Sequence, residues 1–164
     1  MSVQIRTADS RHLPAILDII NEAILHTTAI YDYARRSEAE HLKWYQEKKN
    51  EGFPLLVAER DNEIVGFATY HTFKPKIGYR FTAEHSVYVR PSCHGQGIGS
   101  ALLARIIESA KENGLHSLVG YIDAANAGSL HFHRKLGFEE VGRLREVGYK
   151  FDQWLDVCLM QRFL

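Results

Sequence analysis

Apolar residues recur at helical spacing in some stretches of this chain, and in others they alternate with polar residues or run together. The period of three to four residues predicts two amphipathic helices, with apolar faces on Leu13, Ile16, Leu17, Ile20 and Ile24 and on Leu102, Leu103, Ile106, Ile107 and Ala110. Shorter runs predict strands at 3–6, 55–59, 64–70, 83–89, 118–122, 141–149 and 154–162. With two more helices, one ending near Gly52 and one at 127–136, the predicted order is β-α-α-β-β-β-α-β-α-β-β.

Local signals mark where several of these elements begin or turn. Asp9 or Ser10 can cap the first helix, with Pro14 in its early turns. The sequence Ser-Glu-Ala-Glu at 37–40 is a capping box that predicts the start of the second helix. The polar residues 60–63, which lie between two apolar runs, predict a hairpin turn.

The most informative stretch is 86–100, which predicts a strand, a loop with three alternating glycines and the start of a helix. Glycine at 95, 97 and 99 removes the Cβ atoms that would keep a ligand away from the backbone. The helix behind the loop presents backbone N–H groups without helical partners and the positive end of its dipole. Together these features favour an anion site, with phosphate as the expected anion. The alternative is a tight strand-to-helix turn that binds nothing.

Two common phosphate loops do not fit this stretch. A Walker loop needs a lysine before its Ser or Thr, and no lysine lies between Gly95 and Ser100. The Rossmann fingerprint has the spacing Gly-x-Gly-x-x-Gly, whereas the spacing here is Gly-x-Gly-x-Gly. The loop instead resembles the pyrophosphate loop of the GNAT superfamily of N-acetyltransferases, commonly Arg/Gln-x-x-Gly-x-Gly/Ala. His94 stands where that family usually has Arg or Gln.

The resemblance implies an α/β (α+β) fold with a central mixed β-sheet that is splayed at the acetyl-CoA site and carries helices on both faces. It implies acetyl-CoA as co-substrate and no metal. The residues that it assigns to acetyl-CoA are Val87, Tyr88, Val89, His94, Gly95, Gln96, Gly97, Ile98, Gly99, Ser100, Asn126 and His133.

A second motif supports this resemblance. The stretch 126–138 resembles the family signature Asn-x-x-Ala/Ser-x-x-x-Tyr-x-x-x-Gly-Phe. Asn126 precedes a helix, so its amide can cap that helix, bond the pantetheine arm of CoA, or do both. His133 occupies the place where many relatives have a tyrosine near the leaving thiolate. It either contacts CoA or protonates the thiolate, or it is a histidine on a helix face with neither role.

A third segment points to one branch of the superfamily. The run Glu-His-Ser-Val-Tyr-Val at 84–89, with Arg80 shortly before it, resembles the phosphinothricin and methionine sulfoximine N-acetyltransferases. The stretch 148–156 near the end of the chain resembles their C-terminal hairpin. The resemblance implies a small amino acid or analogue as substrate and a homodimer as the assembly.

The residue types suggest how such a reaction would proceed. An α-amino group is mostly protonated near neutral pH and must lose a proton before it attacks a thioester. Glu84 can accept that proton directly or through water, and the alternative is a carboxylate on an exposed strand face. His85 is a second candidate, but neighbouring strand residues point to opposite faces, so Glu84 and His85 are not expected to touch. The backbone N–H near Val89 would polarise the thioester carbonyl.

Positive charge and aromatic rings nearby suggest a pocket for the amino acid. Arg80 can bind a carboxylate or phosphinate in a two-pronged fork. Residues assigned to the substrate are Arg80, Lys74, Lys76, Tyr33, Tyr31, Glu84, His85 and Ser86. The alternative for Lys74, Lys76, Tyr31 and Tyr33 is a position on the protein surface without contact with the substrate. Cys93 is a possible acyl-enzyme nucleophile, but only His94 beside it resembles a base, which favours direct transfer in a ternary complex.

Length and composition fit a single enzyme domain spanning 1–164. Lys plus Arg and Asp plus Glu both number 20, so neither a nucleic-acid footprint nor a basic membrane anchor is indicated. The N-terminus lacks the apolar run of a signal peptide, no apolar stretch approaches a membrane span, and two isolated cysteines form no disulfide framework. These features predict a cytoplasmic protein. Two other functions remain open: acetylation of protein N-termini or another small amine, and a non-catalytic acyl-CoA sensor.

Overall fold

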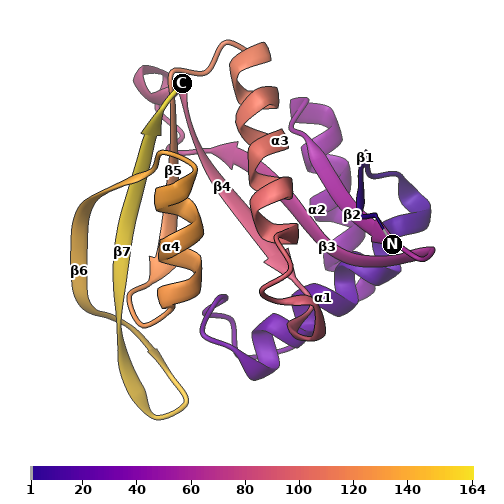
Figure 1. Ribbon diagram of the computed structural model, residues 1–164, viewed down its shortest axis with the longest axis horizontal. Helices are drawn as coiled ribbons and strands as arrows, with labels where there is room; N and C mark the ends of the chain where they lie inside the picture. Colours follow the sequence, from indigo (N-terminus) through magenta and orange to yellow (C-terminus); the bar gives the residue numbers. More distant parts are fainter. Residues whose placement is uncertain (1) are drawn as a thin grey trace.

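A computed structural model describes residues 2–164 of the chain (Figure 1). Its strands are β1 (Gln4–Thr7), β2 (Leu55–Arg60), β3 (Glu63–Thr72), β4 (Thr82–Val89), β5 (Ser117–Asp123), β6 (Glu139–Lys150) and β7 (Gln153–Phe163). Its helices are α1 (Leu13–His26), α2 (Glu38–Glu51), α3 (Ile98–Glu112) and α4 (Ala127–Lys135). Single turns of 3-10 helix lie at Ser10–His12, Ile77–Tyr79 and Pro91–Cys93. The predicted order of helices and strands is confirmed.

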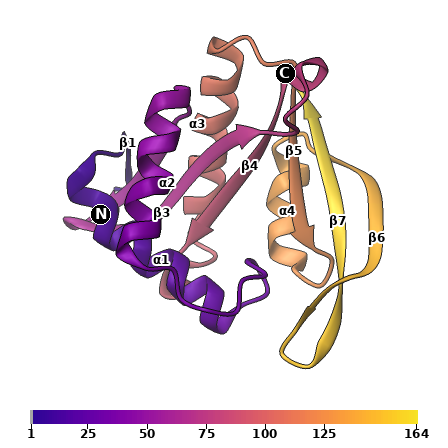
Figure 2. The same cartoon turned by 180° about the vertical axis from the view of Figure 1, so that it is seen from behind.

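All seven strands belong to one sheet, in the order β1-β2-β3-β4-β5-β7-β6. The β4–β5 pair is parallel and the other neighbouring pairs are antiparallel, so the sheet is mixed as predicted. Helices α3 and α4 cover the face turned to the viewer in Figure 1, and α1 and α2 cover the face seen in Figure 2. The predicted sheet with helices on both faces is confirmed.

The two faces of the sheet each carry a hydrophobic core. On β2, Leu56 and Ala58 pack with α3, whereas Leu55 and Val57 pack with α1. This alternation follows from the strand period of two residues, and burial on both faces explains why β2 and β3 are apolar runs rather than alternating ones.

Most of the residues predicted to begin a helix or to form a turn do so in the structure. The Ser37 side chain accepts from the Glu40 backbone N–H while the Glu40 side chain accepts from that of Ser37, which completes the capping box of α2. Asp61 and Asn62 have φ of 54° and 65°, the left-handed pair of a tight hairpin turn. One signal acts differently: Asp9 caps the 3-10 turn at Ser10–His12, and α1 begins only after it.

Strands β4 and β5 separate along their length. Their parallel pairing runs only from Thr82–Ser117 to Glu84–Val119, although β4 continues to Val89 and β5 to Asp123. Pairing of β4 with β3 meanwhile continues without a register shift to the end of β4. The predicted splay is therefore present, and it begins beside Glu84.

Candidate functional site

A cleft of about 500 Å³ opens where β4 and β5 separate. It is lined from both faces of the sheet, by the segment after α1 on one side and by α4 on the other. Its lining residues are Thr28, Ala29, Ile30, Tyr31, Glu84, His85, Ser86, Val87, Tyr88, Gly120, Tyr121, Ile122, Asp123, Asn126, Ser129, His133, Leu144, Val147 and Val157. Eight of the residues that the sequence assigns to a site thus share one cavity: Tyr31, Glu84, His85, Ser86, Val87, Tyr88, Asn126 and His133.

Beyond Glu84 the free edge of β4 offers backbone groups to a ligand. The Arg90 N–H donates to the Val65 carbonyl on β3 at 2.8 Å. Hydrogen-bonding direction alternates along an antiparallel strand, so the N–H groups of Val87 and Val89 point away from β3, toward the splay. The Val89 carbonyl on the same side lies 2.8 Å from His94 Nε2. The free edge of β4 therefore offers backbone donors to the splay, and the role of the Val89 N–H toward a thioester stays a prediction. His94 Nε2 meanwhile lies within hydrogen-bond distance of the strand.

The glycine loop has the geometry of an anion site. Gly95 and Gly97 have φ of 74° and 77°, and a Cβ built on either would meet no atom within 4 Å, so both border open space. Gly97 is the N-cap of α3 and makes no side-chain cap bond. The first helical bond runs from the Ala101 N–H to the Gly97 carbonyl at 3.0 Å. The N–H groups of Ile98, Gly99 and Ser100 precede it and are available to an anion.

Two residues of this stretch lie differently from what the loop pattern suggests. A Cβ on Gly99 would lie 3.6 Å from the Phe132 ring and 3.8 Å from Val89 Cγ2, so this glycine faces α4 and β4 inside the protein. A contact of Gly99 with a phosphate would therefore be made by its backbone N–H, and the phosphate role of this residue stays a prediction. The Gln96 side chain binds Arg60 and the Ser92 carbonyl, so it braces the loop from the protein side.

Glu84 and His85 lie on opposite faces of β4, as the strand period predicts. Glu84 pairs across the strands with His71, whose Nε2 lies 3.6 Å from Glu84 Oε2. The Glu84 side chain is 28% exposed, so it is open to the cleft and to water. His85 is buried against the Phe138 ring on the α4 side. The carboxylate of Glu84 therefore lines the cleft without contact with the imidazole of His85, and its role as a base stays a prediction.

His85 bonds His133 instead, and their Nε2 atoms lie 2.9 Å apart. His133 Nδ1 lies 2.7 Å from the Ser129 carbonyl, which only accepts, so Nδ1 carries a proton. His133 Nε2 then accepts from His85, and this network assigns the tautomers of both rings. Burial lowers the pKa of His133 to about 4, and burial together with the neighbouring His133 lowers that of His85 to about 3. Both imidazoles are neutral at physiological pH.

Gly120 on β5 makes room for this pair. A Cβ at Gly120 would lie 2.6 Å from His85 Cε1, closer than any real side-chain contact. Any larger residue at this position would displace the His85 ring from its place against His133. The sequence contains no local signal for this requirement, because the two strands meet only in the fold.

The neutral histidine pair predicts an acid-sensitive stability. Between about pH 6.5 and pH 4 the unfolded His133 binds a proton that the folded one does not, so the free energy of unfolding falls as pH falls, by about 1.4 kcal/mol per pH unit. His133→Gln removes this group. In the variant, the free energy of unfolding should therefore fall less steeply with falling pH, by the amount that corresponds to about one proton. Urea unfolding between about pH 7 and pH 5 measures the slope. Equal slopes for the two proteins would contradict the assigned protonation states.

Asn126 fulfils its capping role, since its Oδ1 accepts from the Ser129 N–H at 3.0 Å. It also lines the cleft, so the pantetheine role stays a prediction beside it. Other lining residues were not identified from the sequence, among them Thr28, whose hydroxyl donates to Asp123 at the end of β5. They come from distant parts of the chain, so no local pattern marks them.

The predicted basic residues lie outside this cavity. Lys74, Lys76 and Arg80 are exposed in the connection between β3 and β4, and the Arg80 guanidinium lies 4.3 Å from the centre of the Phe81 ring. Tyr33 is also outside the lining, with its hydroxyl donating to the Tyr149 carbonyl. Among residues 2–164, those that line the cleft include Glu84 and Asp123 but no lysine or arginine.

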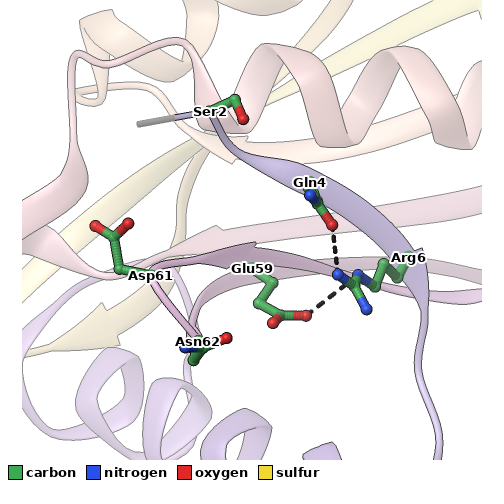
Figure 3. Close-up of a pocket in the computed structure, with 6 residues that line it drawn as sticks. All are labelled: Ser2, Gln4, Arg6, Glu59, Asp61 and Asn62. Atoms are coloured by element: carbon green, nitrogen blue, oxygen red, sulfur yellow. Dashed lines mark hydrogen bonds and ion pairs between the residues drawn. The ribbon is translucent and has the colours of Figure 1, made fainter.

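A second hollow, of about 350 Å³, lies at the β1 edge of the sheet (Figure 3). It is lined by polar residues of β1 and the residue Ser2 before it, of the end of β2 and of the β2–β3 turn, and its Arg6 is paired with Glu59 at 3.2 Å. The strand order places this edge three strands away from β4, so the hollow is separate from the cleft.

Two general properties bear on the type of site. Within residues 2–164, no group of three or more His, Cys, Asp or Glu side chains is gathered in a way that could hold a metal ion. None of the helices in that part of the chain has the length and apolar character needed to cross a lipid bilayer.

Comparison with known proteins agrees with this geometry. Residues 15–138 match the Acetyltransferase (GNAT) family. The chain is 43% identical to an L-methionine sulfoximine/L-methionine sulfone acetyltransferase from Pseudomonas paraeruginosa, over 98% of this chain and 94% of that protein. It is also similar to two solved structures, both with a TM-score of 0.96. One is named as a ribosomal-protein-alanine N-acetyltransferase from Brucella melitensis (44% identical, covering 98% of this chain and 99% of that chain). The other is a phosphinothricin acetyltransferase from Sinorhizobium meliloti in complex with acetyl-CoA (33% identical, 100% and 89%).

Proposed function

Because the chain belongs to the GNAT family of acetyltransferases, we propose that it acetylates the α-amino group of a small amino acid or analogue, with acetyl-CoA as donor. Methionine sulfoximine, methionine sulfone and phosphinothricin are the substrate types named for its relatives. The observation that carries the proposal is the cleft at the splay, where the carboxylate of Glu84 and the free edge of β4 line one cavity.

Acetyl-CoA supplies a thioester whose carbonyl carbon is open to attack by an amine. Glu84 accepts a proton from the substrate ammonium, which frees the nitrogen lone pair for that attack. The N–H of Val89 stabilises the negative charge that develops on the thioester oxygen. A C–N bond forms, the C–S bond breaks, the amine loses its second proton to water, and the thiolate leaves with the electron pair of the C–S bond. We assign direct transfer because Cys93 is buried and its sulfur lies 3.0 Å from Arg60 Nη2.

His133 shapes the cleft in this proposal and is not the acid that protonates the thiolate. Both of its ring nitrogens have protein partners, and its imidazole is neutral. A thiol has an ordinary pKa near 8.5, so a departing thiolate can take its proton from water at neutral pH. Contact between His133 and CoA, the other role predicted from the sequence, is compatible with its place in the lining.

Recognition of the α-carboxylate requires positive charge that the cleft lining of residues 2–164 does not supply. Arg80 remains our candidate, with Lys74 and Lys76 at the rim, because all three lie in the connection that leads into β4. All three are exposed and lie outside the cleft, so a contact with the substrate would require this connection to move or a second copy of the chain to supply the residue.

A thiol-release screen tests the proposed function. Purified enzyme with acetyl-CoA is offered each amino acid, methionine sulfoximine, methionine sulfone, phosphinothricin, and peptides with free N-termini. We expect the free amino acids or their analogues to give the highest kcat/KM. A preference for peptides would favour protein N-termini, the substrate class that the name of the Brucella protein indicates. Binding of acetyl-CoA without transfer to any amine would favour the sensor function.

We further propose a homodimer in the cytoplasm. The β6–β7 hairpin exposes large apolar side chains along its length: Val141, Leu144, Val147, Tyr149, Phe151, Trp154 and Phe163. Such a surface is typical of a contact with another protein, and Trp154, at 63% exposed, offers a large anchor. Light scattering at micromolar concentration should give twice the mass of one chain, and the mass of one chain would refute the dimer.

Both cysteines are free thiols, which is consistent with a reducing compartment.

A further inference from the structure

Lys150, the last residue of β6, is a buried cation outside the proposed chemistry. It is 3% exposed, and its ammonium donates to three backbone carbonyls: Ile24 at 2.6 Å, Thr27 at 2.7 Å and Ile30 at 2.5 Å. The first two carbonyls are at the C-terminal end of α1, where helical carbonyls lack partners and the helix dipole is negative. The third belongs to the segment that follows. The Lys150 side chain therefore joins the end of α1 to the start of the next segment.

The same segment is held to the hairpin and β5 by other contacts. Tyr31 packs on Gly148, where a Cβ would overlap its ring. The Thr28 hydroxyl donates to the Asp123 carboxylate, and the Tyr33 hydroxyl donates to the Tyr149 carbonyl. Residues 27–33 thus lie against the β6–β7 hairpin and the end of β5, and we call this segment the clamped loop.

The clamped loop forms one wall of the cleft. Thr28, Ala29, Ile30 and Tyr31 line it together with Glu84. Helix α1, from which the loop emerges, packs on β3 and β4, whereas Lys150 belongs to the other half of the sheet, beyond β5. Figures 1 and 2 show the segment after α1 at the open end of the gap between β4 and β5. The contacts of the loop therefore bridge the two halves of the sheet across the mouth of the splay.

We propose that Lys150 is a positioning residue that fixes the clamped loop as the amino-acid-binding wall of the cleft. This proposal rests on the proposed function for the identity of the substrate, but the contacts of Lys150 with the loop do not depend on that function. An ammonium has three N–H groups in a tetrahedral arrangement, which match three carbonyls that surround it. The planar guanidinium of arginine does not reproduce this arrangement.

The test compares Lys150→Met with Lys48→Met. Lys48 is an equally buried lysine (5% exposed) whose ammonium donates to the Tyr70 carbonyl, away from the cleft. Both variants lose a buried ammonium, so both should be less stable. In Lys150→Met the KM for methionine sulfone should rise about tenfold or more, while the Kd for acetyl-CoA and the kcat change much less. Lys48→Met should keep the wild-type KM, and Lys150→Arg should not restore the Lys150→Met defect.

Hydrogen exchange provides a readout that does not depend on the substrate. Amides of residues 27–33 should exchange faster in Lys150→Met, while those of β3 keep their protection. If no amino acid is a substrate of the wild-type enzyme, the proposed function fails and this readout still decides the role of Lys150. If Lys150→Met does not fold, Lys150→Arg decides instead, because it keeps a positive charge at this position but not the tetrahedral arrangement of three N–H groups. A folded variant with wild-type KM and unchanged exchange in the clamped loop would overturn the proposal.

Discussion

Replacing Glu84 with glutamine is expected to lower kcat about a hundredfold or more and to leave the Kd for acetyl-CoA within about twofold of wild type. Glutamine keeps the size of the side chain and its place in the cleft lining, but its amide cannot accept a proton from an ammonium. Steady-state kinetics together with calorimetric titration of acetyl-CoA measure the two quantities. The defect should shrink at high pH, where more of the substrate amine is already deprotonated.

His71→Gln provides the matched control for this prediction. It removes the neighbour 3.6 Å from Glu84 and leaves the carboxylate itself in place. We expect a much smaller loss of kcat than in Glu84→Gln. If the Glu84 variant retained most of its kcat, or if the His71 variant lost as much, Glu84 would not be the base.

The second large effect is expected for Gly97→Val, which should weaken acetyl-CoA binding about a hundredfold or more. Gly97 has φ of 77° and is the N-cap of α3, so a branched side chain both strains the backbone and enters the open space beside the anion site. Hydrogen bonds to a charged group contribute about 1.5–3 kcal/mol each, and the loss of one or two suffices for this effect. Calorimetry with acetyl-CoA measures the change.

Gly52→Val is a control that distinguishes loss of the acetyl-CoA site from the backbone strain that a side chain causes at a positive φ. Gly52 ends α2 with φ of 73°, and a Cβ there would also meet no atom within 4 Å. Both variants should lose about 1–2 kcal/mol or more of stability, since a left-handed conformation is costly for a residue with a Cβ. Only Gly97→Val should lose acetyl-CoA binding. A folded Gly97→Val protein that binds acetyl-CoA normally would show that the phosphates lie elsewhere.

Local patterns predicted the elements of this fold well because each is determined by neighbouring residues. The capping box at Ser37 and the hairpin turn at Asp61 and Asn62 need only a few consecutive residues to form. The glycine loop was recognisable for the same reason, since strand, glycines and helix follow one another along the chain. The strand period also placed Glu84 and His85 on opposite faces correctly.

Features that depend on distant contacts were beyond such patterns. The contact of His85 with His133 joins β4 to α4, and it depends on Gly120 in a third element. The role of Lys150 depends on carbonyls more than a hundred residues earlier in the chain. Gly99 likewise differs from its neighbours in the glycine pattern: its Cβ position faces Phe132 and Val89, whereas those of Gly95 and Gly97 face open space.

The most direct test of the central claim compares kcat/KM for methionine sulfone, its α-amide and a short peptide with an N-terminal methionine. All three offer an α-amino group, but only the free amino acid offers an α-carboxylate beside it. We predict that methionine sulfone has the highest kcat/KM of the three. Arginine binds a carboxylate through two parallel hydrogen bonds, so Arg80→Ala should lower the ratio of kcat/KM for methionine sulfone to that for its amide. Faster acetylation of the amide or the peptide by the wild-type enzyme would contradict an amino-acid N-acetyltransferase.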